Sequence, residues 1–281
     1  NYEIAMQELV YNPGKSVLEL VSVETAKRAP LFVQNISETV RRNIKNPKLR
    51  SILEFPVLFL GAKPNNTPAF YNFMNHADFG MGTWYPKGGF NSVAKGMQKL
   101  AEELGVKFMV NEEVTEIFTE DNEAKSVITK NSVFEADIVI SGADYAHTET
   151  LLKQTERNYT VDYWQKKTFA PSSFLYYVAF DKKVPQLQHH NLFFDTDFEK
   201  HAGEIYDTKT LPKKPLFYAN FSSKTDDSLC PEGKEIGFFL IPVAVDLEDS
   251  PEIHDQYFEV IMNRIEKNTG ENLRSSVKIG R

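Results

Sequence analysis

The sequence of 281 residues predicts an α/β fold with a helical portion at its start. Three patterns predict it: a helix over about 92–104, short strands between about 107 and 140, and aromatic-rich strands between about 174 and 243. A final helix is expected to begin at Ser250-Pro251-Glu252, because proline is tolerated in a first turn, and to end at Gly270. This order indicates an α/β part followed by a mixed or antiparallel sheet.

The first part of the chain is predicted to be mainly helical. Between about 24 and 45, apolar side chains recur at helical spacing: Phe32 or Val33, Ile36, Val40 and Ile44. Asn46-Pro47 should end that helix, because the residue before a proline disfavours the helical conformation. A second helix is predicted over about 48–59.

The helix at 92–104 has the best-defined ends. Asn91 or Ser92 can cap its N-terminus, and Gly105 suits the left-handed conformation after its last turn. Its apolar side chains form one stripe, which is typical of a helix that packs against a core: Val93, Met97, Leu100, Ala101 and Leu104.

The short strands that follow are predicted at 107–110 and 114–118, with a hairpin at 126–129 and 133–136. Ile138-Val139-Ile140 predicts one more strand, entirely apolar and followed by small residues. In an α/β sheet such a strand is covered on both faces, and its C-terminal end leads to a ligand crevice.

The aromatic-rich strands are expected to form a sheet with one face lining a chamber, and they are predicted at 174–180, 191–194, 216–221 and 236–243. The last helix should bury a stripe of Phe258, Ile261, Met262 and Ile265. His189 and His190 are expected to point to opposite faces of an extended segment, so no metal site is predicted there.

Composition argues against several classes of protein. The net charge of −7 argues against nucleic acid as a partner, since DNA-binding proteins usually carry a basic surplus. The one cysteine, Cys230, excludes an internal disulfide, fits a reducing compartment and is interpreted as a structural thiol. No apolar run approaches the roughly 20 residues that span a bilayer.

The sequence contains no complete catalytic motif. Gly80-Met81-Gly82 is the one Gly-x-Gly pair, and Tyr85 stands where a dinucleotide-binding loop would need a third glycine. No phosphate-binding P-loop, Gly-x-Ser-x-Gly elbow or His-Glu-x-x-His helix occurs. By themselves the residues leave the reaction open.

Seven short motifs nevertheless occur in an order that is typical of one family of enzymes: 58–69, Trp84–Gly89, Ser141–Thr148, Ala170–Ser173, His189–Phe194, Thr225–Gly233 and Ile241–Val243. In this order they resemble the central part of bacterial phytoene (carotenoid) desaturases, which are FAD-dependent flavoenzymes. The resemblance covers essentially the whole chain.

The resemblance implies three parts. These are a helical substrate- or membrane-facing portion at 1–84, a partial FAD-binding domain of the flavin oxidoreductase type at 85–145, and a mixed-sheet substrate domain with a C-terminal helix at 146–281. The family's N-terminal Gly-x-Gly-x-x-Gly segment and its C-terminal glycine-rich flavin segment have no counterpart here. The chain is therefore expected to be an internal fragment that is inactive by itself and does not retain FAD.

The resemblance also implies site residues for a reaction in which FAD takes a hydride from a polyene precursor and a proton leaves the neighbouring carbon. The FAD-contacting positions would be Gly88, Gly89, Val114, Ser141, Ala143 and Asp144. Trp84 and Tyr85 would face the substrate, and Glu19 lies near a position considered for acid/base work in some family members.

Each of these assignments has a simpler alternative. The glycines could form only a tight turn, and Val114 could be an ordinary strand residue. Asp144 could only cap the next helix, Trp84 and Tyr85 could only pack, and Glu19 could be a solvated helix charge.

A long apolar substrate suggests contact with a membrane. The basic residues next to the apolar run 52–60 suit an anionic membrane surface, or else form a solvated face: Arg41, Arg42, Lys45, Lys48 and Arg50. We expect a cytoplasmic protein, peripheral to the inner face of the membrane. A carotenoid cis–trans isomerase of the same superfamily and a non-catalytic lipid- or membrane-binding domain remain as alternatives, and an amine oxidase fits the carotenoid-specific motifs less well.

Overall fold

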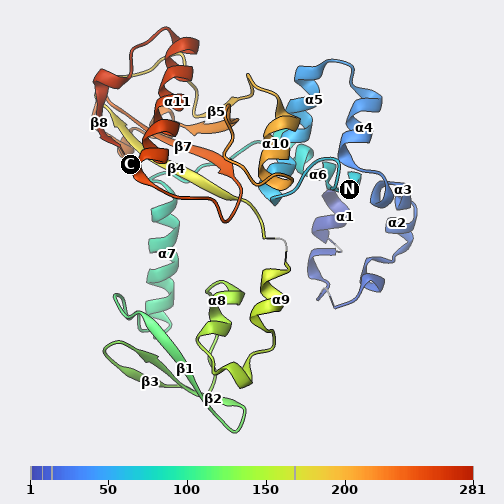
Figure 1. The fold of residues 1–281 in the computed structure, drawn as a ribbon, viewed down its shortest axis with the longest axis vertical. Coiled ribbons are helices and arrows are strands. Elements are labelled where there is room, and N and C mark those ends of the chain that lie inside the picture. The colour runs from blue at the N-terminus through green and yellow to red at the C-terminus, as the bar shows by residue number, and fades with distance from the viewer. Residues whose placement is uncertain (1, 8, 14, 168, 281) are drawn as a thin grey trace. The chain divides into compact units, whose positions relative to one another are not determined.

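The computed structural model describes residues 2–7, 9–13, 15–167 and 169–280 and divides into two compact units (Figure 1). The larger unit comprises Asn1–Ala94 and Ala170–Arg281, and the smaller one comprises Lys95–Phe169. The sequence predicted three consecutive segments instead. Because compactness does not reveal which residues serve a cofactor or a substrate, that functional division stays a prediction.

The larger unit is built on a five-stranded antiparallel sheet with the strand order β5-β6-β7-β4-β8. Its strands are β4 (Ser172–Phe180), β5 (His190–Phe193), β6 (Phe217–Asn220), β7 (Glu235–Val243) and β8 (Val277–Gly280). The four strands predicted from aromatic-rich runs are confirmed. The short strand β8 was not predicted, because four residues give too little pattern.

The two faces of this sheet differ in burial, since side chains alternate along each strand. On β4, Tyr176 and Phe180 are buried, whereas Leu175 and Tyr177 are 40% and 61% exposed. The buried face packs against α11 (Pro251–Thr269) in one apolar core. The side chains of α11 that the core buries are Tyr257, Ile261, Met262 and Ile265, and Phe258 packs beside them only partly buried. Gly270 ends α11 in the left-handed conformation, as predicted.

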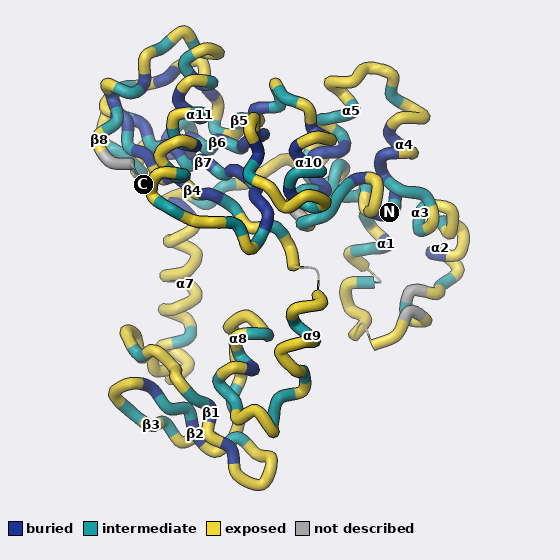
Figure 2. Tube along the Cα trace, in the orientation of Figure 1, coloured by how far each residue is buried: buried dark blue, intermediate teal, exposed yellow. Residues whose placement is uncertain are grey.

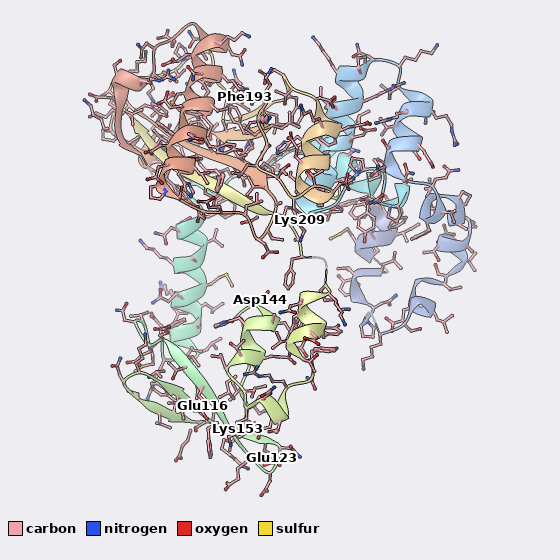
Figure 3. The ribbon with its side chains drawn as sticks, in the orientation of Figure 1. Glu116, Glu123, Asp144, Lys153, Phe193 and Lys209 are labelled. Atoms are coloured by element: carbon pink, nitrogen blue, oxygen red, sulfur yellow. The ribbon has the colours of Figure 1, made fainter. Side chains whose placement is uncertain are left out.

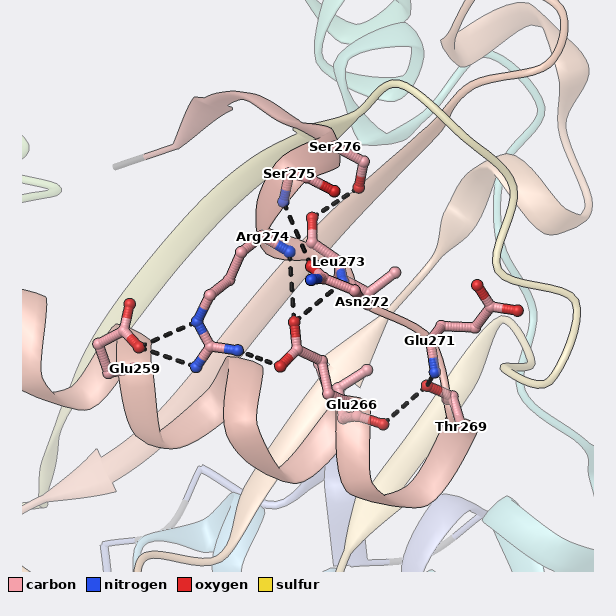
Figure 4. Close-up of polar contacts among 10 residues, drawn as sticks. Glu259, Glu266, Thr269, Glu271, Asn272, Leu273, Arg274, Ser275 and Ser276 are labelled. Carbon is pink, nitrogen blue, oxygen red and sulfur yellow. Dashed lines mark hydrogen bonds and ion pairs between the residues drawn. The ribbon is translucent and has the colours of Figure 1, made fainter.

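Glu266 and Arg274 fix the turn between α11 and β8 (Figure 4). One carboxylate oxygen of Glu266 accepts hydrogen bonds from the backbone N–H groups of Leu273 (3.0 Å) and Arg274 (3.3 Å). The Arg274 guanidinium pairs with Glu266 and, at 2.8 Å, with Glu259. These contacts hold the chain where it returns to the sheet as β8.

The first eighty residues form short helices in place of the longer ones predicted. The helix expected at 24–45 is divided into α2 (Val23–Ala26), α3 (Ala29–Val33) and α4 (Ile36–Asn43). Asn35 explains the last break, because its side chain caps α4 while its backbone forms a β-bridge with Pro68. The expected helix at 48–59 is α5 (Pro47–Glu54) followed by the 3₁₀ segment η3 (Phe55–Leu60), where Pro56 cannot donate a helical hydrogen bond.

The remaining elements of the larger unit are α1 (Tyr2–Gln7), η1 (Leu9–Tyr11), η2 (Val17–Leu20), η4 (Ala69–Asn72), α6 (Phe73–Asn75), η5 (His76–Gly80), α10 (Phe198–Tyr206), η7 (Ser222–Lys224), η8 (Asp227–Leu229) and η9 (Arg274–Ser276). None of the helices in the part of the chain that the structure describes has the length and apolar character needed to cross a membrane.

The smaller unit contains a three-stranded antiparallel sheet of β1 (Val114–Glu120), β2 (Glu123–Thr129) and β3 (Val133–Glu135). Helix α7 (Phe90–Glu103) leads into this unit, and α8 (Tyr145–Thr150), η6 (Gln154–Glu156) and α9 (Val161–Gln165) follow the sheet. The predicted middle helix and hairpin are confirmed. The predicted cap was wrong: α7 begins at Phe90, so Asn91 and Ser92 lie inside the helix, and the Ser92 hydroxyl donates to the Gly89 carbonyl instead of accepting. Asp121 and Asn122 make the turn between β1 and β2 with left-handed φ values of 52° and 61°.

Two predicted strands were wrong. Residues 107–110 and 138–140 are not strands and pair with no strand among the described residues. Ile138 and Ile140 are 78% and 90% exposed, Met97 on α7 is 69% exposed, and Leu104, directly after α7, is 77% exposed. Figure 2 draws most of α7 in the yellow of exposed residues. A strand needs a neighbour that satisfies its backbone, and the apolar pattern alone could not supply one.

Candidate functional site

An apolar chamber lies over the less buried face of the five-stranded sheet. Its larger cavity, of about 710 Å³, is lined by Tyr85, Phe90, Tyr177, Val178, Ala179, Tyr218, Asn220, Ser222, Ile236, Gly237 and Phe238. A smaller cavity of about 300 Å³ is lined mainly by apolar side chains of η3, β6 and β7. Tyr218 lines both cavities, so they meet at this side chain. The prediction that one sheet face lines a chamber is consistent with this arrangement.

A polar pocket adjoins the chamber at Tyr85, which lines both. We call it the histidine cavity; its volume is about 400 Å³, and its lining residues are Thr83, Trp84, Tyr85, Lys87, His189, His190, Thr225 and Asp226. Trp84 is 86% exposed, and its indole N–H donates to the Met81 carbonyl at 3.2 Å. Both predicted substrate-facing residues thus border a cavity, while their contact with substrate stays a prediction.

The two histidines do not point apart, so that expectation was wrong. Their rings lie 4.2 Å apart and border the same cavity. The reason is that β5 begins only at His190, so the alternation of an extended strand does not include His189. The ring of His189 also meets that of Tyr85 edge-on at 4.9 Å.

A short relay of hydrogen bonds joins the histidine cavity to the chamber. Nδ1 of His190 lies 2.6 Å from the Tyr218 hydroxyl, which accepts a hydrogen bond from the Asn220 amide at 2.8 Å. Burial raises the pKa of Tyr218 and lowers that of His190. The phenol and the imidazole are therefore both held in their neutral forms near pH 7.

The predicted cofactor glycines form the turn that leads into α7. Gly88 and Gly89 have φ values of 83° and 78°, which strain any residue with a side chain. The Gly88 N–H donates to Asp226 at 2.5 Å, and Ser228 donates to the other carboxylate oxygen of Asp226 through its N–H and hydroxyl. These bonds, the Ser228 hydroxyl first and Gly88 next, lower the pKa of Asp226. A buried carboxylate therefore holds the glycine turn in place.

The other four predicted cofactor residues belong to the smaller unit. Val114 opens β1 and is 37% exposed. Ser141, Ala143 and Asp144 are exposed, and the Ser141 hydroxyl lies 2.7 Å from that of Thr148. Asp144 caps α8 by accepting from the His147 N–H at 3.1 Å, at the position labelled in Figure 3. The capping role is present, and a cofactor role for these residues stays a prediction.

Glu19 takes part in a capping box at η2. Its carboxylate accepts from the N–H groups of Lys15 (3.0 Å) and Ser16 (3.1 Å), while Ser16 caps the same turn. This arrangement gives Glu19 a structural role in the described segment. An acid/base role for it stays a prediction.

Sequence reasoning missed His189, Tyr218 and Asp226 as site residues. The motifs His189–Phe194 and Thr225–Gly233 supported the resemblance, yet their polar side chains were given no role. Polar side chains next to apolar strands in both motifs were the signal that could have indicated site residues. Only the folded chain shows that His189 and Asp226 border one cavity and that Tyr218 is hydrogen-bonded to His190 beside it.

Comparison with known proteins shows the family of the chain. The model of the flavin containing amine oxidoreductases matches residues 24–273. A carotenoid 3,4-desaturase from Haloarcula japonica is 38% identical over 281 residues, 99% of this chain and 57% of that protein. A zeta-carotene-forming phytoene desaturase from Myxococcus xanthus is 31% identical over 73% of this chain and 39% of its own length.

Two solved structures share the fold. An oxidoreductase from Methanosarcina mazei has a TM-score of 0.60 at 19% identity, with 93% of this chain and 61% of that one covered. A protein from Pyrococcus furiosus has a TM-score of 0.61 at 18% identity, with 94% and 62% covered. The chain spans about half the length of the curated relatives it matches.

The described residues fit a flavin only in part. The glycine turn adjoins two residues that line the histidine cavity, because Lys87 precedes Gly88 and Asp226 accepts from the Gly88 N–H, whereas the remaining predicted contacts lie in the smaller unit. The similar proteins include carotenoid desaturases, which confirms the predicted resemblance. Because the family model covers most of the chain, this chain belongs to the flavin-containing amine oxidoreductase family.

Proposed function

We propose that the protein containing this chain is an FAD-dependent desaturase of a carotenoid precursor such as phytoene, and that this chain is its central part. The apolar chamber on the sheet face is the observation that carries the proposal, because a long hydrocarbon needs a long apolar surface. The similarity to carotenoid desaturases supports the same substrate class. The bound flavin would supply the acceptor for hydride.

The residues of this chain would bind the polyene and exclude water from it. Tyr177, Phe238 and Leu240 present apolar surface to the chamber from β4 and β7. Burying such a chain contributes about 25 cal/mol for each Å² of apolar surface removed from water. Tyr218, where the two cavities meet, would lie against the middle of a bound polyene.

A mutation can test the chamber directly. Expressed in a bacterium that accumulates phytoene, the complete flavin-bound protein should produce pigment with new visible absorption bands. Ala179 lines the larger cavity, so Ala179→Trp should fill it and reduce the yield of pigment at least tenfold. Lys183→Trp is the matched control, since Lys183 is exposed on the turn after β4 and should keep the yield.

The alternatives predict other products. A cis–trans isomerase would leave the number of conjugated double bonds unchanged, whereas a lipid-binding domain would bind the polyene without converting it. A colourless extract that contains the flavin-bound protein and unchanged phytoene would refute phytoene desaturation. Without further segments we expect this chain to bind no FAD tightly, which titration of FAD fluorescence on the isolated chain would check.

We further propose that α4 and α5 contact an anionic membrane surface. Arg41 is engaged by Glu54 and Glu199, and Arg50 donates to the Ile44 carbonyl. Arg42, Lys45 and Lys48 are exposed, and no ion pair among the described residues involves them. They flank the exposed apolar side chains Leu49 and Ile52, which are 49% and 40% exposed.

Vesicle binding tests this membrane contact. Reversing the three free charges to glutamate should weaken sedimentation with phosphatidylserine vesicles by at least tenfold, since each basic residue near such a surface contributes about 1 kcal/mol. Equal binding of the wild type to neutral and anionic vesicles would contradict the proposal. In that case only the apolar residues would bind the protein to the membrane surface.

A further inference from the structure

One ring nitrogen of His189 has no hydrogen-bond partner among the residues that the structure describes. Its Nδ1 lies 2.6 Å from the Thr225 hydroxyl, and its ring is held between Tyr85 and His190. Its Nε2 is buried, and no described residue offers it a hydrogen bond. An imidazole fixed on three sides with a buried free nitrogen is unusual, because nearly all buried polar atoms in proteins find a partner.

Asp226 and His190, which also line the histidine cavity, already have hydrogen-bond partners. Asp226 accepts from Gly88 and Ser228, and His190 is bonded to Tyr218. The Nε2 atom of His189 is therefore the nitrogen of the histidine pair that the fold leaves buried and unsatisfied. Such an atom costs about 1–3 kcal/mol if it stays unpaired, so it is typical of a group that meets a ligand.

The hydrogen bond at Nδ1 is compatible with a proton on that nitrogen. The Thr225 hydroxyl lies 3.4 Å from the Ser222 carbonyl, to which it can donate, so Nδ1–H of His189 can donate to the hydroxyl. In that tautomer Nε2 presents a lone pair. The imidazole can then accept a proton at Nε2 while its bond to Thr225 is kept.

Burial and the neighbouring His190 favour the neutral form of the His189 ring. Burial first, and His190 second, lower the pKa of His189. The titratable groups that face the histidine pair are Asp78, Tyr85, Lys87, His190, Tyr218 and Asp226. Asp226 accepts hydrogen bonds from the Gly88 N–H and from the N–H and hydroxyl of Ser228.

From this geometry we propose that Nε2 of His189 is the proton acceptor of the desaturation, and that the histidine cavity opens onto the reacting carbons of the polyene. The proposal rests on the proposed function. One C–H bond breaks, its proton passes to Nε2, and its electron pair becomes the new C=C bond. The neighbouring carbon loses its hydrogen together with the bonding electrons, as hydride, to an oxidised flavin.

Two substitutions separate the two ring nitrogens. His189→Asn keeps a polar atom near the position of Nδ1, and His189→Gln keeps one near that of Nε2, but neither can accept a proton. In the complete flavin-bound protein, both variants should slow the bleaching of flavin by polyene at least about 100-fold, the effect typical of a lost general base. KM should change less than threefold, and the acidic limb of the pH–rate profile should vanish in both.

His254→Gln is the matched control. His254 lies on α11, where its Nε2 pairs with Asp249 at 2.6 Å, outside the histidine cavity. This variant should keep both the wild-type rate and the acidic limb. If His189→Gln retains the rate within threefold, or if the acidic limb survives in either His189 variant, the proposal is overturned.

A measurement without turnover tests the same atom. Nitrogen NMR of the complete protein should show His189 protonated at Nδ1 and unprotonated at Nε2, and the Nε2 signal should shift when a fully conjugated, unreactive polyene binds. A proton on Nε2, or an unmoved signal, would overturn the proposal. A wild type that converts no polyene refutes the proposed function itself, whereas a converting wild type with an active His189→Gln variant refutes only the role of this residue.

Discussion

The buried histidine His201 makes the stability of the larger unit depend on pH. It lies on α10 and is 2% exposed. Its Nδ1 accepts from the Leu216 backbone N–H at 3.0 Å, so the ring proton is on Nε2, which donates to the Pro242 carbonyl at 3.1 Å. Protonation of Nδ1 would break the first of these bonds. Burial lowers the pKa of His201 from 6.5 to about 4.

The sign and size of the effect follow from that difference. As the pH falls, the unfolded chain takes up a proton at about 6.5, before the folded chain does, so the free energy of unfolding decreases. The decrease is complete below about pH 4. The pKa of His201 differs between 6.5 in the unfolded chain and about 4 in the folded chain. At about 1.4 kcal/mol for each pKa unit, protonation of this side chain lowers the free energy of unfolding by about 3 kcal/mol in total.

Comparing the wild type with His201→Leu isolates this contribution. Leucine cannot titrate, so the stability advantage of the wild type over the variant should shrink by about 2–3 kcal/mol between pH 7.5 and 4.5. Urea-dependent hydrogen exchange at the β7 amides measures it for the larger unit alone. His254→Gln should keep the wild-type dependence, because it leaves His201 in place. A constant difference between wild type and His201→Leu across this range would refute the reasoning.

Two further predictions concern packing and polar contacts. A Cβ at Gly237 would lie 2.9 Å from a ring carbon of Phe180, so Gly237→Ala should lower the free energy of unfolding by about 1–3 kcal/mol in urea titrations. Gly96→Ala in α7 meets no described atom within 4 Å and should raise it by up to about 1 kcal/mol; equal effects would contradict this. Glu149, 3% exposed, accepts from the Trp164 indole at 2.8 Å and from two backbone N–H groups. Glu149→Ala should therefore destabilise the smaller unit by about 3 kcal/mol, seen as earlier unfolding in Trp164 fluorescence, and an unchanged midpoint would exclude that role.

The site was predictable where local sequence decides the backbone. Pro86 followed by two glycines predicted a tight turn, and Gly88 and Gly89 both have left-handed φ values. The buried carboxylate that holds this turn, Asp226, lies 138 positions further along the chain. No local pattern could pair these residues, because the pairing depends on how the sheet folds.

Local sequence patterns predicted the aromatic-rich strands, the C-terminal end of α7, both ends of α11 and the hairpin of the smaller unit. These features depend on alternation, capping and turn chemistry, which are properties of neighbouring residues. The tertiary structure decided which apolar segments find partners: Ile261 is fully buried against the sheet, whereas Ile140, equally apolar, is 90% exposed. It also placed His189 against Thr225 and left one ring nitrogen without a hydrogen-bond partner among the described residues. Burial and pairing between distant segments depend on the whole chain. The sequence therefore determined those elements that local patterns define, and only the packing of the chain determined the site.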